Sequence, residues 1–358
     1  MNEVKALKNQ QMQGILNKHF SGKHIALVLS GGLEVRETFT LLNHLKAFSD
    51  LDLSIYLHQS VNRYFTPAAF RVYGDIFTLA EPDFESAFDS YDCVGVLDWD
   101  NRLPEIAATV QAQIGYGQSD GDAKVSFRGD WQPVLEYLAL LCAEELPWKN
   151  RTVLVTAGRT EEPIDPVRLI TNRSSGKMGF ALARQASLLG ATVTLVSGPN
   201  DLVTPFGVQR IDVLTVDEMF KACNTHFPES DVFIAAAAVE DLKPVSVSRQ
   251  KIKKEQSMVI ECEAAVDILN TLSQQKTHQF IVGFSVETEN MLENSRKKLL
   301  RKALDAIVMN NPTETGAGFQ HDTNKATLVF KDGEPVEFPL LSKEELAARI
   351  LNKIHEKL

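Results

Sequence analysis

The sequence has few cysteines, and none of them falls in a pattern that carries chemistry. Its four cysteines, Cys93, Cys142, Cys223 and Cys262, are scattered along 358 residues and form no CxxC pair. Such pairs are typical of zinc sites and redox motifs, so their absence argues against both. The eight histidines are equally dispersed, which also disfavours zinc. We expect free thiols in a reducing cytoplasm.

Long apolar runs are missing as well. No stretch approaches the roughly 20 apolar residues that a bilayer-spanning helix needs. The first residues, MNEVKALKNQQMQG, lack the apolar core of a signal peptide. We therefore expect a cytoplasmic protein without a membrane partner.

Basic charge is scarce in the first part of the chain. Residues 1–149 hold 12 Lys and Arg against 20 Asp and Glu, whereas the remainder holds 25 against 27. Nucleic acids and anionic membranes bind basic surfaces, so neither is an expected partner. The nearly neutral second part leaves room for a local basic pocket that holds an anionic ligand.

Strands alternate with helices in the first part, which predicts a parallel sheet. Apolar strands are expected at 23–30, 51–58 and 91–98, and helices at 103–115 and 131–146. The pattern restarts near ELPWKN, and the length suits two domains. We place them at 1–148 and 149–358.

The second part repeats this alternation more clearly. Strands are expected at 151–158, 191–199, 208–215, 231–239, 279–286 and 304–311. A helix with one apolar face begins near Gly176 and stops at Gly190. A late β-hairpin over 326–340 turns at Asp332-Gly333, and a capping box from Ser342 to Glu345 opens the last helix. These signals predict a doubly wound α/β domain.

The connection from Gly158 to this helix is several times longer than ordinary strand-to-helix loops. Its last part, TNRSSGKMG, resembles a Walker A loop, but Met178 stands where Ser or Thr belongs and Thr171 where glycine belongs. Long loops at the carboxyl ends of parallel strands bind ligands, and helix N-termini favour phosphate. From the residues alone, an anion site and an N-capping loop are equally supported.

Two further stretches have both a structural and a functional interpretation. Four alanines from Ala235 let a ligand approach the backbone, or they serve tight packing. The polar stretch 244–255 carries Lys251 and resembles a lid, although charge runs usually face solvent. Lys298 and Lys302 are four residues apart, so they share a helix face and can reach one polyanion.

Taken in order, these segments resemble the phosphopantothenoylcysteine synthetase family, the ligase part of the bifunctional flavoprotein of coenzyme A synthesis. The matches are TAGRTEEPIDPVRLITNRSSGKMG, AAAVEDLKP, KIKK, GFSVETEN, the Lys-rich helix before LDAIVMNN, and GAGFQHDTNKATLV. The resemblance covers about residues 150–356. It implies a Rossmann-like ligase domain that joins 4′-phosphopantothenate to L-cysteine with CTP as cosubstrate, through an acyl-cytidylate, and with Mg²⁺.

The resemblance also implies the site residues. Asn172 holds the acyl-cytidylate, Arg168 lies beside it, and Lys251 comes from the lid during acyl transfer. The implied nucleotide-binding residues are Gly158, Ser174, Ser175, Gly176, Ala235, Ala236, Ala237, Asp241, Val266, Asp267, Ile268, Leu269, Phe284, Lys298 and Lys302. Lys177 then has no P-loop role and is expected to face solvent. The sequence departs from the family at Ala265-Val266, where Asn-Pro is usual, and at Glu240 and Val286, where alanine is usual.

The first part of the chain resembles the family's flavin-dependent decarboxylase only remotely. Its strands, the SGG turn and YFTPAAF (64–70) suggest a degenerate flavodoxin-like domain. The family's catalytic histidine is absent from 81–92, and 97–106 replaces the family's Ala-Pro-Ala-Thr-Ala-Asn segment. The later Pro-x-Met-Asn and cysteine motifs are absent too. We expect no decarboxylase activity, no bound FMN, and a separate decarboxylase elsewhere; ligases of this type lead us to expect a homodimer.

Two other functions remain open from the sequence. A Rossmann-type oxidoreductase needs a short GxGxxG turn, which is missing here. A non-catalytic regulatory homologue would keep the fold without the site, but Asn172, Lys251, Lys298 and Lys302 are all present. A ligase is therefore the preferred reading.

Overall fold

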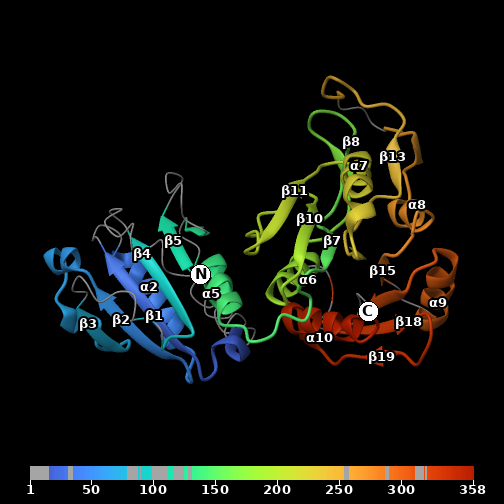
Figure 1. Ribbon diagram of the computed structural model, residues 1–358. Coiled ribbons are helices and arrows are strands. Elements are labelled where there is room, and N and C mark those ends of the chain that lie inside the picture. The colour runs from blue at the N-terminus through green and yellow to red at the C-terminus, as the bar shows by residue number, and fades with distance from the viewer. Residues whose placement is uncertain are drawn as a thin grey trace. The chain divides into compact units, whose positions relative to one another are not determined.

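The chain forms two compact units, Met1–Glu145 and Leu146–Leu358 (Figure 1). The computed structural model describes residues 16–30, 35–78, 88, 90–98, 112–116, 125–127, 131–253, 258–286, 290–310, 318 and 321–358. The decarboxylase-motif comparisons at 81–87 and 99–106 lie outside these residues. Within the described part, every helix is too short or too polar to span a bilayer.

Unit 1 is built on a parallel six-stranded sheet in the order β3-β2-β1-β4-β5-β6. Its elements are β1 (His24–Ser30), α2 (Val35–Lys46), β2 (Asp52–Leu57), β3 (Asp75–Thr78), β4 (Cys93–Asp98), β5 (Ala112–Tyr116), β6 (Val125–Phe127), α5 (Gln132–Leu141) and the 3₁₀ turns η1 (Gln59–Arg63) and η2 (Pro67–Ala69). The predicted parallel α/β class is confirmed. This strand order is the one typical of dinucleotide-binding folds, whereas flavodoxin itself has 2-1-3-4-5.

The helix predicted over 103–115 is wrong where the structure describes it. Residues Ala112–Tyr116 form strand β5, which pairs with β4 on one side and β6 on the other. Hydrogen bonds to two neighbouring strands satisfy its backbone and outweigh a local helical preference. The short strands β3 and β6 gave no recognisable signal in the sequence.

Unit 2 contains an eight-stranded sheet in the order β11-β10-β7-β12-β15-β16-β18-β19. The strands are β7 (Thr152–Ala157), β10 (Thr192–Ser197), β11 (Val208–Asp212), β12 (Val232–Ala235), β15 (Phe280–Val286), β16 (Ala306–Asn310), β18 (Ala326–Phe330) and β19 (Val336–Glu337). The first six in the chain are parallel, and β18 and β19 are antiparallel. The doubly wound sheet and the late hairpin are both confirmed.

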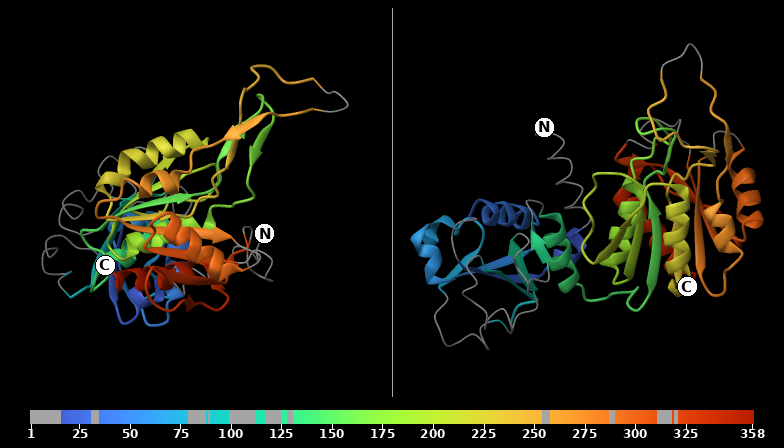
Figure 2. Two further views of the ribbon diagram at one scale, coloured as in Figure 1. Left: turned by 90° about the vertical axis from the view of Figure 1, so that its right-hand side faces the viewer. Right: turned by 90° about the horizontal axis from the view of Figure 1, so that it is seen from above.

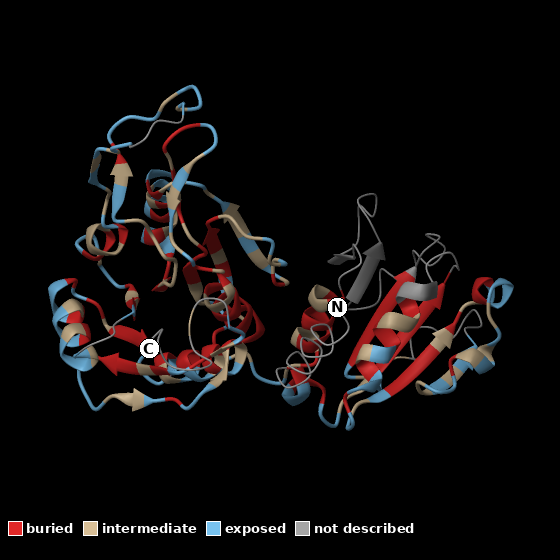
Figure 3. Cartoon of the chain, turned by 180° about the vertical axis from the view of Figure 1, so that it is seen from behind, coloured by how far each residue is buried: buried red, intermediate tan, exposed pale blue. Residues whose placement is uncertain are grey.

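Helices cover both faces of this sheet and create two hydrophobic cores (Figures 1 and 3). On one face, Val153 and Val155 pack with α6 (Lys177–Leu188) and α10 (Lys343–His355). On the other, Leu154 packs with α7 (Val216–His226), α8 (Ile268–Ser273) and α9 (Met291–Arg301). Alternate residues of β7 therefore serve opposite cores, and burial of each such side chain contributes about 1.5–3 kcal/mol.

The capping box predicted at the start of α10 forms only in part. At α10, the Ser342 hydroxyl accepts a hydrogen bond from the Glu345 N–H at 3.1 Å, as predicted. The Glu345 carboxylate, however, pairs with Arg349 one turn later, at 2.6 Å. A complete capping box is formed instead at α7 by Thr215 and Glu218. The turn η3 (Phe227–Glu229) follows α7.

Two hairpins project from the carboxyl end of the sheet and together form what we call the extension, residues 159–172, 242–253 and 258–264 (Figure 2). The first pairs β8 (Glu161–Pro163) with β9 (Leu169–Thr171), and the second pairs β13 (Leu242–Pro244) with β14 (Cys262–Ala264). The stretch 244–255, predicted as a lid, begins in this second hairpin. A small ladder of β17 (Thr323–Asn324) with β20 (Leu341–Ser342) lies just before α10.

Candidate functional site

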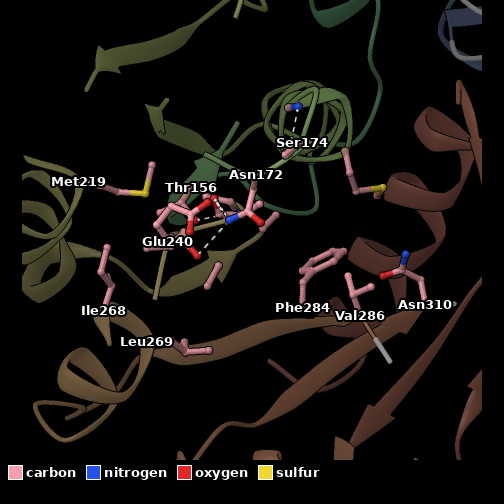
Figure 4. Close-up of a pocket in the computed structure, with 18 of the residues that line it drawn as sticks. Thr156, Asn172, Ser174, Met219, Glu240, Ile268, Leu269, Phe284, Val286 and Asn310 are labelled. Carbon is pink, nitrogen blue, oxygen red and sulfur yellow. Dashed lines mark hydrogen bonds between the residues drawn. The ribbon is translucent and has the colours of Figure 1, made fainter. Parts of the chain in front are cut away.

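A cavity of about 570 Å³ opens at the carboxyl ends of the parallel strands of unit 2. Strand β7 lies between β10 and β12, so the chain turns in opposite directions after β7 and β12. Open α/β sheets form their ligand crevice at such a switch point. The cavity lies there, and Figure 4 shows side chains from several separate segments around it.

Two glycines allow helix α6 to begin close to the sheet. Gly158 ends β7 with φ +79°, and a Cβ there would lie 2.9 Å from the Gly198 carbonyl oxygen. Gly176 precedes α6 with φ +78°, and its added Cβ would lie 3.3 Å from the Gly158 Cα. Both positions need the left-handed backbone that glycine adopts freely. Gly176 therefore lines the cavity, whereas Gly158 lies against Gly176 and does not line it.

Asn172 connects the loop after β7 with the loop after β12. Its Nδ2 donates to the Ala238 carbonyl at 3.4 Å and to the Val239 carbonyl at 3.5 Å (Figure 4). Beside it, the Thr160 hydroxyl accepts a hydrogen bond from the Glu240 N–H at 2.9 Å. These contacts fix the Asn172 side chain at the wall of the cavity before any ligand arrives.

The alanine run leaves the sheet earlier than predicted. Strand β12 ends at Ala235, whereas the sequence predicted a strand to Val239. The Ala237 N–H then bonds the Thr156 hydroxyl at 3.2 Å, and this side-chain partner replaces a ladder partner. The small side chains from Ala235 to Ala237 line the cavity and leave room against the backbone.

Two adjacent carboxylates, Glu240 and Asp241, follow the alanine run and also line the cavity. Partial burial and the nearby charges of Asp241 and Glu162 raise the pKa of Glu240. A carboxylate beside a ligand pocket can accept hydrogen bonds from an exocyclic amino group of a base.

The opposite wall combines an ion pair with apolar side chains. Asp267 caps α8 by accepting the Asn270 N–H at 3.0 Å, and the Lys302 ammonium contacts it at 2.6 Å. Burial alone would raise the pKa of Asp267, but the Lys302 and Asn270 hydrogen bonds outweigh it and the pKa is lowered. Phe284 on β15 and Lys298 on α9 also line the cavity.

The cavity brings together all the predicted site residues except Gly158, Arg168 and Lys251. Those that line it are Asn172, Ser174, Ser175, Gly176, Ala235, Ala236, Ala237, Asp241, Val266, Asp267, Ile268, Leu269, Phe284, Lys298 and Lys302.

Arg168 and Lys251 lie in the extension instead. The Arg168 guanidinium pairs with the buried Asp165 carboxylate at 3.1 Å and donates to the Ile252 carbonyl at 3.2 Å. The Ile252 N–H donates to the same Asp165. These bonds join the two hairpins next to Lys251, whose side chain is exposed. Among the described residues of one chain, therefore, neither the Arg168 guanidinium nor the Lys251 ammonium lines the cavity.

Several lining residues escaped the sequence analysis. Lys177 was expected to face solvent, but it lines the cavity and pairs with Asp322 at 2.5 Å. Asn310 ends β16, and its place at the carboxyl end of a strand could have identified it. Others, among them Thr156, Asn324 and Lys343, carried no signal as site residues, because only tertiary packing places them there.

The fold defines a Rossmann-like α/β domain with a cavity at the switch point of its sheet. Residues 148–358 match the family model described as DNA/pantothenate metabolism flavoprotein C-terminal domain, and the chain belongs to this family. The resemblance inferred from the sequence is thereby confirmed.

Individual relatives agree with this assignment. The chain is 46% identical over 213 residues to the coenzyme A biosynthesis bifunctional protein CoaBC of Vibrio cholerae, covering 58% of this chain and 53% of that protein. Its identity to the Bacillus subtilis CoaBC is 44% over 210 residues, covering 58% and 52%. A crystal structure of a CoaBC C-terminal domain matches with TM-score 0.52 and 42% identity, covering 60% of this chain and 98% of that one. The chain thus spans about half the length of the curated relatives it matches.

Proposed function

We propose that the chain joins 4′-phosphopantothenate to L-cysteine with CTP as cosubstrate, through an acyl-cytidylate. One observation supports this most: residues from separate segments, including Asn172, the α6 N-terminus, Lys298 and Lys302, converge on one cavity. The family membership and the names of the relatives point to the same pathway.

The reaction proceeds in two displacements. The carboxylate of phosphopantothenate attacks the α-phosphorus of CTP and releases pyrophosphate. The cysteine amine then attacks the acyl carbon, forms the amide, releases CMP and loses a proton. A carboxylate resists amines until its oxygen becomes a good leaving group, which explains the need for the nucleotide. The protein's main contribution is alignment and electrostatic stabilisation.

The residues around the cavity suit these tasks. Asn172 offers an amide to the acyl-phosphate group, and the N-terminal end of α6, next to Ser174 and Ser175, presents the positive end of its dipole to phosphate oxygens. Lys298 and Lys302 supply positive charge, and Asp241 accepts the amino group of cytosine. The described residues hold no cluster of three His, Cys, Asp or Glu side chains fit for a metal. We therefore propose that Mg²⁺ enters with the nucleotide, held mainly by its phosphates.

Pyrophosphate release tests this function directly. The full chain with phosphopantothenate, cysteine and CTP is expected to release pyrophosphate in step with CMP, whereas ATP in a parallel reaction supports a much lower rate. Omission of phosphopantothenate serves as the control for nucleotide hydrolysis. Absence of pyrophosphate release with both CTP and ATP would exclude a ligase.

The visible spectrum of the same purified protein is expected to show no flavin band, because we propose that the first part of the chain binds no FMN and that a separate protein is the decarboxylase.

We also propose that two chains form a homodimer through the extension. Seven large apolar side chains are exposed there: Val167, Leu169, Leu242, Val245, Val247, Met258 and Val259. Exposed apolar side chains that gather on one part of a chain are typical of an interaction surface. Arg168 and Lys251 lie on the same extension, so a partner chain offers a way to bring them to a cavity that lacks both.

Charges placed on the extension are expected to weaken the dimer. The double substitution Val167→Asp with Val259→Asp buries four carboxylates in a twofold interface, at a cost of several kcal/mol. We expect dissociation to monomers in analytical ultracentrifugation, together with loss of ligase activity. Val72→Asp in unit 1 is the matched control, since Val72 is 61% exposed and Val167 62%. A double variant that stays dimeric would place the interface elsewhere.

A further inference from the structure

Glu240 lies in the wall of the cavity beside Asn172. Asn172 donates to the carbonyls of Ala238 and Val239, and Glu240 follows Val239 directly. Both residues line the cavity, and Figure 4 shows them on the same side of it. The Glu240 N–H donates to the Thr160 hydroxyl at 2.9 Å. The backbone at Glu240 is therefore fixed next to the side chain that we assign to the acyl-phosphate group.

Two other carboxylates influence the Glu240 carboxyl group. Partial burial raises its pKa, and the negative charges of Asp241 and Glu162 raise it further. Asp241 is the next residue in the chain, and Glu162 is a buried residue of β8. A carboxylate with a raised pKa is a stronger base, and a cation beside it relieves the repulsion from its neighbours. The surroundings of Glu240 therefore favour a cationic group that can give up a proton.

The charges of the proposed reactants point to one such group. Among the described residues, three carboxylates line the cavity: Glu240, Asp241 and Asp267. Asp267 contacts the Lys302 ammonium at 2.6 Å and caps α8, and Asp241 is proposed to accept the amino group of cytosine. CTP and phosphopantothenate are anions, whereas a free amino acid carries an ammonium group at neutral pH. The amino acid is therefore the reactant that matches Glu240.

We propose that the Glu240 carboxylate binds the ammonium group of the amino-acid substrate and takes one proton from it. This inference rests on the proposed function and adds a role that the resemblance does not supply, since alanine is usual at this position in the family. The freed lone pair forms the N–C bond to the acyl carbon. The bond from that carbon to the phosphate oxygen breaks, and CMP leaves with its electron pair. The second amine proton passes to water, and Glu240 returns the first one to solvent.

Glu240→Gln tests this role, because glutamine keeps the shape of the side chain but loses its charge and its basicity. The full chain is first mixed with CTP and phosphopantothenate alone, and acyl-cytidylate formation is expected to be unchanged. When cysteine is added, kcat/KM for cysteine is expected to fall by roughly 10- to 100-fold, the usual range for a lost hydrogen bond to a charged group. Unchanged kcat/KM for cysteine would overturn the proposal.

Hydroxylamine separates proton removal from other roles of Glu240. This small amine is already neutral at neutral pH, and it converts an acyl-cytidylate to a hydroxamate that can be measured by its coloured iron complex. Because its lone pair needs no base, Glu240→Gln is expected to keep the wild-type rate of hydroxamate formation. An equal loss with hydroxylamine and with cysteine would assign Glu240 to alignment or folding and contradict the proposal.

The pH dependence gives a second signature of a base. The wild-type rate with cysteine is expected to fall as pH falls through the pKa of Glu240, which lies above its ordinary value of 4.5. The neighbouring charged groups, Asp241 and Glu162, are the same in both proteins. As pH rises, cysteine itself becomes a free amine, so the rate of Glu240→Gln is expected to approach that of wild type. A constant ratio of the two rates above this pKa would contradict the role.

Three further variants serve as controls. Glu334→Gln removes an exposed carboxylate between β18 and β19 and is expected to behave as wild type. Glu240→Asp keeps the charge on a shorter side chain and is expected to retain more activity with cysteine than Glu240→Gln. If Glu240→Gln does not fold, Glu240→Ala, with the residue usual in the family, takes its place under the same expectations.

The two half-reactions distinguish failure of this inference from failure of the proposed function. If wild type forms no acyl-cytidylate and releases no pyrophosphate, the ligase function fails and the role of Glu240 fails with it. If wild type is an active ligase and Glu240→Gln keeps the wild-type kcat/KM for cysteine, the ligase function is supported and this inference alone fails.

Discussion

Asn172→Asp is expected to lower kcat by roughly 100- to 1,000-fold, the usual cost of losing one donor to a developing charge. Asn172 donates to the Ala238 and Val239 carbonyls, at 3.4 and 3.5 Å. Aspartate has the same shape, but its carboxylate cannot donate and is repelled by both carbonyl oxygens. It also adds a negative charge beside Glu240 and Asp241, near the site proposed for the acyl-phosphate.

CTP affinity is expected to survive this substitution, because the α6 N-terminus, Lys298 and Lys302 are untouched. Single-turnover quench-flow with CTP and phosphopantothenate measures acyl-cytidylate formation, and calorimetry measures CTP binding. Asn224→Asp, an exposed asparagine in α7, is the matched control and is expected to behave as wild type. If the Asn172→Asp variant kept wild-type kcat but bound CTP more weakly, Asn172 would contact the nucleotide and not the reacting acyl group.

Much of unit 2 could be predicted from the sequence because most of its central strands are short apolar runs, and β7 and β10 are each followed by a glycine. Val153, Leu154 and Val155 are buried alternately on two faces, which makes β7 apolar throughout. The helix prediction for 103–115 in unit 1 failed because this segment carries no such local signal for a strand. Strand β5 depends on pairing with β4 and β6, and no local pattern encodes those partners.

The candidate site was predictable where one segment carries its own signal. Asn172, Gly176 and the alanine run each stand beside a strand end or a helix start. Lys343 could not be found in this way, because in the sequence it is simply the first residue of a helix. It becomes a site residue only because α10 packs on α6 and turns that end toward the cavity. Part of the candidate site therefore depends on tertiary contacts that form only in the folded chain.

Gly179→Ala is expected to destabilise unit 2 and slow the ligase, although glycine-to-alanine changes in helices usually stabilise by about 0.5–1 kcal/mol. An added Cβ at Gly179 would lie 2.5 Å from the Ala157 Cβ and 3.0 Å from the Thr156 carbonyl oxygen. Overpacking of this kind costs about 1–3 kcal/mol, so the clash outweighs the helical gain. Helix α6 must move off β7, and a shift of about 1 Å at a reacting centre can cost about 100-fold in rate.

Removal of the opposing methyl group separates this clash from a general helix effect. Ala157→Gly deletes the atom nearest to the new Cβ, so the double variant is expected to recover part of the stability and of kcat/KM. Urea unfolding of wild type, both single variants and the double variant gives the coupling free energy, expected at about 0.5–2 kcal/mol in favour of the pair. A single Gly179→Ala protein more stable than wild type, with unchanged kcat/KM, would show that α6 does not depend on this close approach. Since Gly176 directly precedes α6 and Gly179 lies in its first turn, the placement of that turn against β7 is expected to affect both the stability of unit 2 and the proposed ligase reaction.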